Sequence, residues 1–146
     1  MSEIEILLVE DNPDDLEMTL HALREAKVAN RIQVARDGAE ALDFIFCQGI
    51  FAARRMENGP KIILLDLKLP KVDGREVLAR IKGDDRTKKI PVIVLTSSKE
   101  QNDVVDTYDL GVNSYIVKPV DFEQFVAAIK QLGMYWLLLN QPPLVN

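Results

Sequence analysis

Charged and hydroxyl-bearing side chains stand at the ends of apolar runs along the chain. Glu10 and Asp11 follow the first run, Asp66 closes "KIILLD", Thr96 closes "IPVIVLT" and Lys118 closes "SYIVK". Core packing does not explain a buried run that ends in a carboxylate, because taking an unpaired charge out of water is costly. We therefore expect these side chains to belong to one site.

Three carboxylates brought together repel one another, and the repulsion raises the pKa of at least one of them. A divalent cation removes this conflict, and ligands that are all oxygen atoms select a hard ion, Mg²⁺ before Zn²⁺. Lys118 would add a second positive charge, and Thr96 would add a hydrogen-bond donor. A cation, an ammonium and a hydroxyl around one carboxylate suit phosphoryl transfer. Asp66 is then the expected nucleophile, which forms an aspartyl phosphate.

The elements that must position these residues follow from the spacing of apolar side chains. Runs typical of strands lie at 4–9, 31–35, 61–66, 90–96 and 114–118. Helical spacing or helix-start signals predict helices over 13–27, from 38, over 74–82, over 99–110 and from 122. The alternation predicts an α/β fold with a doubly wound, five-stranded parallel sheet and helices on both faces. Right-handed crossovers bring all the strand C-termini to one edge, where such folds bind ligands.

Composition limits the kinds of protein this chain can be. Its 146 residues, 47% apolar and 28% charged, suit one globular domain. A net charge of −5 argues against general nucleic-acid binding, and no apolar run is long enough to span a membrane. Cys47 is the only cysteine and no signal peptide is visible, which favours the cytoplasm. Residues 47–60 lack a clear period and read as a loop, in which the Arg54-Arg55 pair is expected to be solvated.

The motifs resemble those of the response-regulator receiver domain of two-component signalling, which has a flavodoxin-like (βα)5 fold. The matching pieces are "LLVEDNPDD", "DLKLPKVDG", "VIVLTS" and "YIVKP", in that order and each at a strand end. One such piece alone is a weak signal, whereas the ordered set is specific. The long 47–60 segment and the "WLLLNQPP" tail are similar to single-domain receivers that serve phytochrome-type histidine kinases. We therefore expect one receiver domain over 1–146, with a loop insertion at 47–60 and a C-terminal extension at 133–146.

The resemblance implies how the acidic residues divide the work. Asp66 would accept the phosphoryl group from a partner histidine kinase. Asp11, Asp66 and the backbone carbonyl of Lys68 would ligate Mg²⁺. Glu10 would hold the ion directly or through water.

The resemblance also implies a switch beside the phosphoacceptor. Lys118 would pair with the phosphoryl group, and Thr96 would move to hydrogen-bond one of its oxygens. Tyr115 would turn inward as Thr96 moves. The peptide bond between Lys118 and Pro119 would be cis.

The last helix carries a feature that the sheet does not require. Its apolar residues recur at spacings typical of a coiled-coil seam, namely Phe122, Phe125, Ile129, Leu132, Trp136 and Leu139. We expect homodimerisation through Tyr135, Trp136 and Leu139; the alternative is that this cluster folds back on its own subunit. Only one helix and a short tail follow the last strand, so the expected output is a protein contact and not DNA binding.

Two other functions compete with the phosphoacceptor switch, which is not itself an enzyme beyond self-dephosphorylation. A phosphatase of the haloacid-dehalogenase type also uses an aspartate after a strand, but it needs a second aspartate two residues later. Lys68 occupies that position. A receiver that acts as a binding module without phosphorylation is the second alternative. Degenerate receivers of that kind usually lose the aspartate, the acidic pair or the lysine, and this chain keeps all three.

Overall fold

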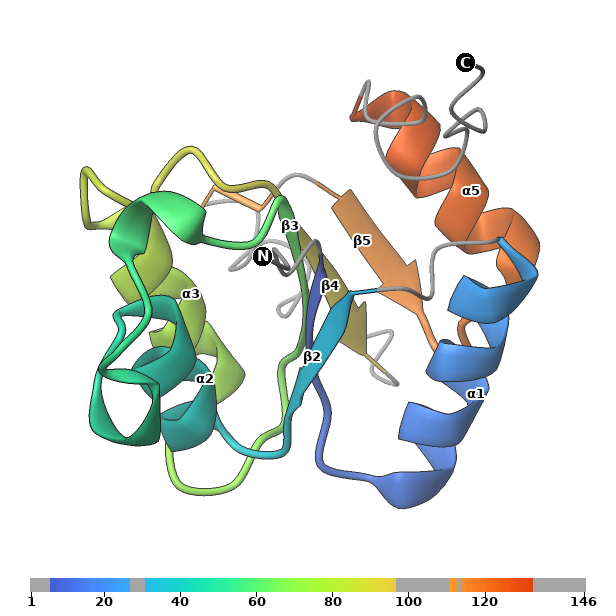
Figure 1. Cartoon of the computed structure of the whole chain (residues 1–146). Helices are drawn as coiled ribbons and strands as arrows, with labels where there is room; N and C mark the ends of the chain where they lie inside the picture. The colour runs from blue at the N-terminus through green and yellow to red at the C-terminus, as the bar shows by residue number, and fades with distance from the viewer. Residues whose placement is uncertain (1–5, 27–30, 97–110, 113, 133–146) are drawn as a thin grey trace, which may run out of the picture.

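The computed structural model describes residues 6–26, 31–96, 111–112 and 114–132, and it has strands and helices in alternation (Figure 1). The strands are β1 (Ile6–Val9), β2 (Ile32–Ala35), β3 (Ile62–Asp66), β4 (Val92–Thr96) and β5 (Ser114–Val117). The helices are α1 (Pro13–Glu25), α2 (Gly38–Ile45), α3 (Gly74–Lys82) and α5 (Phe122–Gln131). Within these residues, no helix combines the length and the apolar character needed to cross a bilayer. The predicted helix over 99–110 lies outside the described residues.

The strands form one five-stranded parallel sheet, as predicted, and their order in it is β2-β1-β3-β4-β5. Strand order reverses between β1 and β3, because the chain leaves β1 for one edge and returns on its other side. In register, Val9 pairs with Leu65, so Glu10 and Asp66 follow side by side at the same edge. Thr96 pairs with Val117, which places Lys118 next in line. The sheet therefore brings the predicted strand-end residues to its C-terminal edge.

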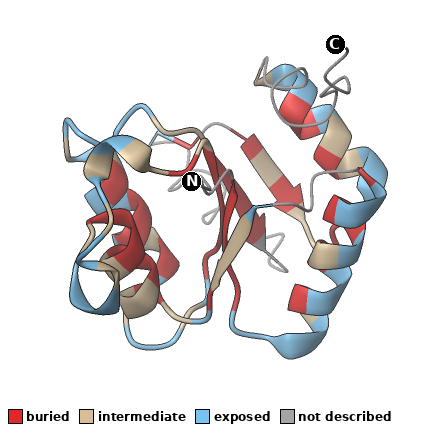
Figure 2. Cartoon of the chain, in the orientation of Figure 1, coloured by how far each residue is buried: buried red, intermediate tan, exposed pale blue. Residues whose placement is uncertain are grey.

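The sheet is buried on both faces, which explains the continuous apolar runs (Figure 2). On one face, Leu8 and Leu64 pack in a cluster with side chains of α1 and α5 such as Leu23 and Phe125. On the other face, Leu7, Val9, Ile63 and Leu65 pack with Phe44 of α2 and Leu78 of α3. The alternation along each strand divides its side chains between these two cores.

Four helices begin at capped positions that fix where the preceding loops end. The Asn12 side chain accepts a hydrogen bond of 2.9 Å from the backbone N–H of Asp15, and Pro13 opens α1. Aspartates cap the other helices in the same way, namely Asp37, Asp73 and Asp121. These local signals agree with the helix starts predicted from the sequence.

The 47–60 insertion contains two short 3-10 helices, η1 (Gly49–Phe51) and η2 (Met56–Asn58), and Arg54 lies between them. The Arg54 guanidinium lies 3.7 Å from the centre of the Phe44 ring and donates hydrogen bonds to the carbonyl oxygens of Phe44 and Asn58. The expectation of a solvated Arg54 was therefore wrong. The arginine ties the insertion to α2 because cation–π and carbonyl contacts replace its water.

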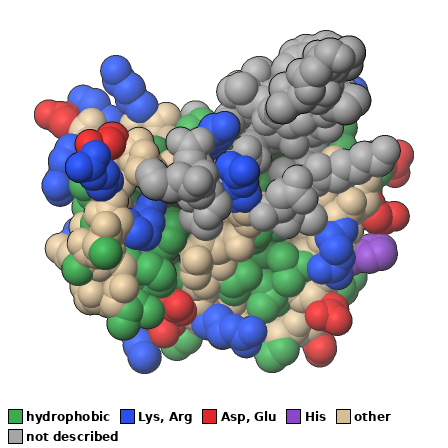
Figure 3. Space-filling model, viewed as in Figure 1, with side chains coloured by type: hydrophobic (Ala, Val, Ile, Leu, Met, Phe, Trp, Pro, Cys, Tyr) green, Lys and Arg blue, Asp and Glu red, His purple; other side chains and the backbone are tan. Residues whose placement is uncertain are grey.

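Acidic and basic side chains mingle on the surface seen in the space-filling view (Figure 3). On this face, the charged side chains of the described residues do not gather into one region of a single sign.

Candidate functional site

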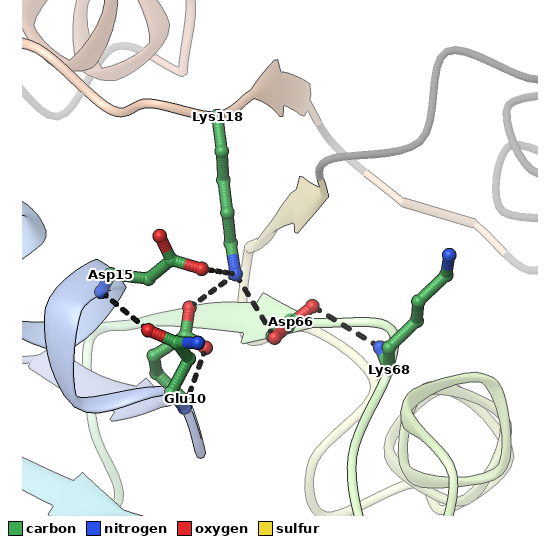
Figure 4. A network of polar contacts seen from close by, with 6 residues as sticks. Glu10, Asp15, Asp66, Lys68 and Lys118 are labelled. Atoms are coloured by element: carbon green, nitrogen blue, oxygen red, sulfur yellow. Dashed lines mark hydrogen bonds and ion pairs between the residues drawn. The ribbon is translucent and has the colours of Figure 1, made fainter.

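Three chain segments converge on the ammonium of Lys118 at the C-terminal edge of the sheet (Figure 4). Its Nζ lies 3.1 Å from Asp66 Oδ2 at the end of β3 and 2.6 Å from Glu10 Oε1 just after β1. The contact to Asp66 is a hydrogen bond, whereas the contact to Glu10 is an ion pair without hydrogen-bond geometry. The exposed fractions of the Lys118, Asp66 and Glu10 side chains are 8%, 6% and 0%. Charges this well buried must compensate one another.

Glu10, Asp11 and Asp66 form an acidic cluster in which one oxygen from each residue lies within 4.8 Å of the others. Glu10 and Asp66 are buried and Asp11 is exposed. An all-oxygen set with one open side suits a hard divalent cation that keeps some of its water. The residues present therefore fit a metal of this class.

Glu10 is an acid whose ionised form is disfavoured by burial and by its acidic neighbour. The pKa of Glu10 is raised from 4.5 to about 7; burial is the largest cause, the Asp66 carboxylate also raises this pKa, and Lys118 lowers it. A divalent cation beside the cluster would favour the ionised form of Glu10.

Lys118 keeps its charge in spite of its burial. Burial alone would lower the pKa of Lys118, but the carboxylates of Glu10 and Asp15 outweigh it and raise that pKa above its ordinary value. The ammonium is therefore a permanent cation at neutral pH. The Lys118–Pro119 peptide bond is cis, as predicted.

The turn from β3 into α3 orients the Asp66 carboxylate. The backbone N–H of Lys68 donates a 3.1 Å hydrogen bond to Asp66 Oδ1, while the Lys68 side chain is exposed and points away (Figure 4). Gly74 closes the turn, because its N–H donates to the carbonyl of Leu67 at 3.0 Å. The assignment of the Lys68 carbonyl to a metal stays a prediction.

Gly74→Ala is expected to destabilise the protein by about 3 kcal/mol, because the close packing at this turn leaves no room for a side chain. A Cβ at position 74 would lie 2.4 Å from the carbonyl oxygen of Asp66 and 2.6 Å from the Cα of Leu67. Both neighbours are backbone atoms, so the strain falls on the turn that carries Asp66. Urea unfolding followed by circular dichroism measures the change.

Gly59→Ala is the matched control for this prediction. A Cβ at Gly59 would meet its nearest atoms at 3.5 and 3.7 Å, which is ordinary contact. We expect the free energy of unfolding to change by less than about 1 kcal/mol. It can rise slightly, because alanine restricts the unfolded chain. Equal stability of the two variants would contradict the steric account of Gly74.

The structure describes the other predicted site residues only in part. Thr96 ends β4 beside Val117, but its side chain lies outside the description. Tyr115 is half-buried and packs against the core cluster on the α2 and α3 side. Tyr135, Trp136 and Leu139 lie outside the described residues.

Comparison with known proteins decides the family. The chain matches the family model of the response regulator receiver domain over residues 6–130. It belongs to the response regulator receiver family.

This receiver is similar to regulators named for phytochromes. The solved bacteriophytochrome response regulators RtBRR and AtBRR are 55% and 52% identical to it, with TM-scores of 0.85 and 0.82. Those matches cover 97% of this chain in both cases, and 85% and 100% of the other chains. Response regulator Rcp1 of Synechocystis sp. is 40% identical over 90% of this chain and 88% of its own. An Mn²⁺-bound form of Rcp1 has been solved; that match has a TM-score of 0.75 at 36% identity and covers 99% of this chain and 100% of the other.

Family membership establishes the general activity. Receivers accept a phosphoryl group on an aspartate from a histidine kinase, bind a divalent metal and signal through protein contacts, and they act as switches and not as enzymes of metabolism. The phosphatase alternative is not supported, because the position of its second acid is held by the exposed Lys68.

One residue of this receiver's site was missed by the sequence analysis. Asp15 Oδ2 lies 3.0 Å from Lys118 Nζ, as a third carboxylate on the same ammonium. The signal was present in the "LLVEDNPDD" motif, because Asp15 stands in the first turn of the helix that starts shortly after the Glu10-Asp11 pair. Asp15 does not stand at a strand end; it reaches the site from the first turn of α1.

Proposed function

We propose that Asp66 is the aspartate that accepts the phosphoryl group, in a single receiver domain over 1–146 that works as a phosphorylation-activated switch. The observation that carries this proposal is the position of Asp66. Its carboxylate lies where strand order reverses, hydrogen-bonded to Lys118 at 3.1 Å and beside two further acids. Asp66 is the buried aspartate of the described acidic cluster, since the other buried acid there is Glu10.

The proposed reaction is an in-line transfer from a phosphohistidine of the kinase. An Asp66 carboxylate oxygen attacks phosphorus, the O–P bond forms, the bond from phosphorus to the histidine nitrogen breaks, and the electron pair returns to the imidazole. The product carries about one more negative charge than the carboxylate did. Lys118 neutralises part of this charge because its ammonium is already in contact with Asp66.

The proposed cofactor is Mg²⁺. Asp11, Asp66 and the backbone carbonyl of Lys68 would ligate it, with Glu10 in direct or water-mediated contact. When bound, it supplies positive charge to the oxygens of the transferred group. The choice of Mg²⁺ within the divalent class rests on the donor set, which consists of oxygen atoms alone.

The proposed output is a change of shape near β4 and β5. Thr96 moves to the phosphoryl group and Tyr115 turns inward behind it, a two-state change biased by a local charge. The partner is a histidine kinase of the phytochrome type, in line with the names of the similar regulators. We also propose a cytoplasmic homodimer that binds neither nucleic acid nor membrane, joined through Tyr135, Trp136 and Leu139.

Incubation with acetyl phosphate and Mg²⁺, followed by intact-mass measurement, tests the proposal. We expect a gain of one phosphoryl group that disappears when EDTA replaces Mg²⁺. Lack of any gain with the small donor and with a cognate kinase would favour the receiver that works as a binding module without phosphorylation.

A further inference from the structure

Asp15 reaches the site from α1 and contacts the ammonium of Lys118 (Figure 4). Its Oδ2 lies 3.0 Å from Lys118 Nζ, and its side chain is 35% exposed. Its backbone is held by the helix cap, because its N–H donates to Asn12 Oδ1 at 2.9 Å. The carboxylate therefore starts from a fixed point and faces Lys118 on one side and water on the other.

The Lys118 ammonium is surrounded by three carboxylates. A lysine has three N–H donors and no acceptor. Asp15 and Asp66 accept hydrogen bonds from it, and Glu10 forms an ion pair at 2.6 Å. A phosphoryl oxygen that comes to Lys118 therefore competes with these three carboxylates for the ammonium.

The three carboxylates differ in the free-energy cost of moving away from the Lys118 ammonium. Glu10 has a fully buried side chain, so removing its cation would leave a buried charge without compensation. Asp66 carries the phosphoryl group itself and cannot move away from it. Asp15 is the most exposed of the three and can turn to water at little cost.

We propose that Asp15 is a positioning residue that occupies the phosphoryl-binding face of Lys118 until the phosphoryl group arrives. In the unphosphorylated protein it holds the ammonium over Asp66. On phosphorylation it gives up its place, so its interaction opposes the activated state. This inference rests on the proposed function of Asp66, and it assigns to Asp15 the setting of how strongly the site holds a phosphoryl group.

Calorimetric titration with beryllofluoride, a phosphoryl mimic, in the presence of Mg²⁺ tests the proposal on the full chain. Asp15→Asn removes the competing charge, so the variant is expected to bind beryllofluoride roughly tenfold more tightly than wild type. Asp14→Asn is the matched control, since Asp14 is exposed and adjacent in the first turn of α1, yet successive helical side chains point in different directions. This control measures the effect of net charge alone.

The outcomes separate the inference from the proposed function. A tighter complex for Asp15→Asn than for Asp14→Asn, with wild-type affinity restored in Asp15→Glu, supports the inference. Equal affinities of the two asparagine variants, or a loss of unfolding free energy without tighter binding, would overturn it and leave the function of Asp66 intact. A wild-type chain that neither binds beryllofluoride nor takes a phosphoryl group would overturn both.

Discussion

Asp66→Asn is expected to abolish phosphoryl uptake. Asparagine has nearly the same shape and keeps an oxygen that can accept the N–H of Lys68, now 3.1 Å from Asp66 Oδ1, so the turn has no reason to unfold. The neutral amide is a poor nucleophile and a weaker metal ligand than the carboxylate. Intact-mass measurement after incubation with acetyl phosphate and Mg²⁺ should therefore show no adduct.

Asp85→Asn is the control for this variant. Asp85 has a side chain that is 92% exposed and pairs with Lys88 on the surface. The Asp85→Asn variant should take up the phosphoryl group as wild type does. An adduct that persists on Asp66→Asn at the wild-type level would move the phosphoacceptor to another residue and refute the assignment.

Lys118→Met is expected to slow phosphorylation by about 10²–10³-fold, the usual effect of removing one charge-stabilising donor from a transition state. Methionine keeps an unbranched side chain of similar length, but it cannot donate to Asp66 or to the incoming oxygens. The same change removes a cation that would repel Mg²⁺, so the affinity for the metal should rise while the rate falls. Single-turnover kinetics and a Mg²⁺ titration measure the two effects separately.

Lys118→Met should also lower stability, since Glu10 and Asp66 would stay buried without their cation. Breaking a buried ion pair costs about 3–5 kcal/mol. The loss here should be smaller, because burial already raises the pKa of Glu10 to about 7 and the residue can take up a proton. Urea unfolding in EDTA measures the change.

Lys88→Met is the matched control, since Lys88 pairs with Asp85 on the exposed surface. It should cost less than about 1 kcal/mol and leave the phosphorylation rate unchanged. A rate for Lys118→Met equal to that of this control would show that the ammonium takes no part in the transfer.

The fold could be predicted because its signals are local. Asn12 and Pro13 mark a helix start in adjacent residues, and the four apolar residues before Asp66 mark a buried strand that ends in an acid. Parallel pairing then brings the strand ends together, because strands of similar length in a right-handed α/β fold must end along one edge. The meeting of Glu10, Asp66 and Lys118 follows from these rules without knowledge of any contact.

The contacts of Arg54 and Asp15 could not be predicted in the same way, because they depend on which side chains meet after folding. No residue near Arg54 in the sequence predicts its contact with the Phe44 ring, which lies ten residues earlier. Asp15 meets Lys118 across 103 residues of chain, and only the packing of α1 beside the sheet decides that its carboxylate faces inward. Both residues carry charge, and charged residues in loops and first turns are solvated by default.

β2 is an edge strand of the sheet, and its open side bears on self-association. A strand with an open side can recruit another chain by backbone pairing, and proteins avoid this with short strands and charged flanks. β2 has only four residues, and exposed Arg31 and Arg36 flank it. Two copies that approached through this edge would bring like charges together, and the repulsion opposes extension of the sheet there.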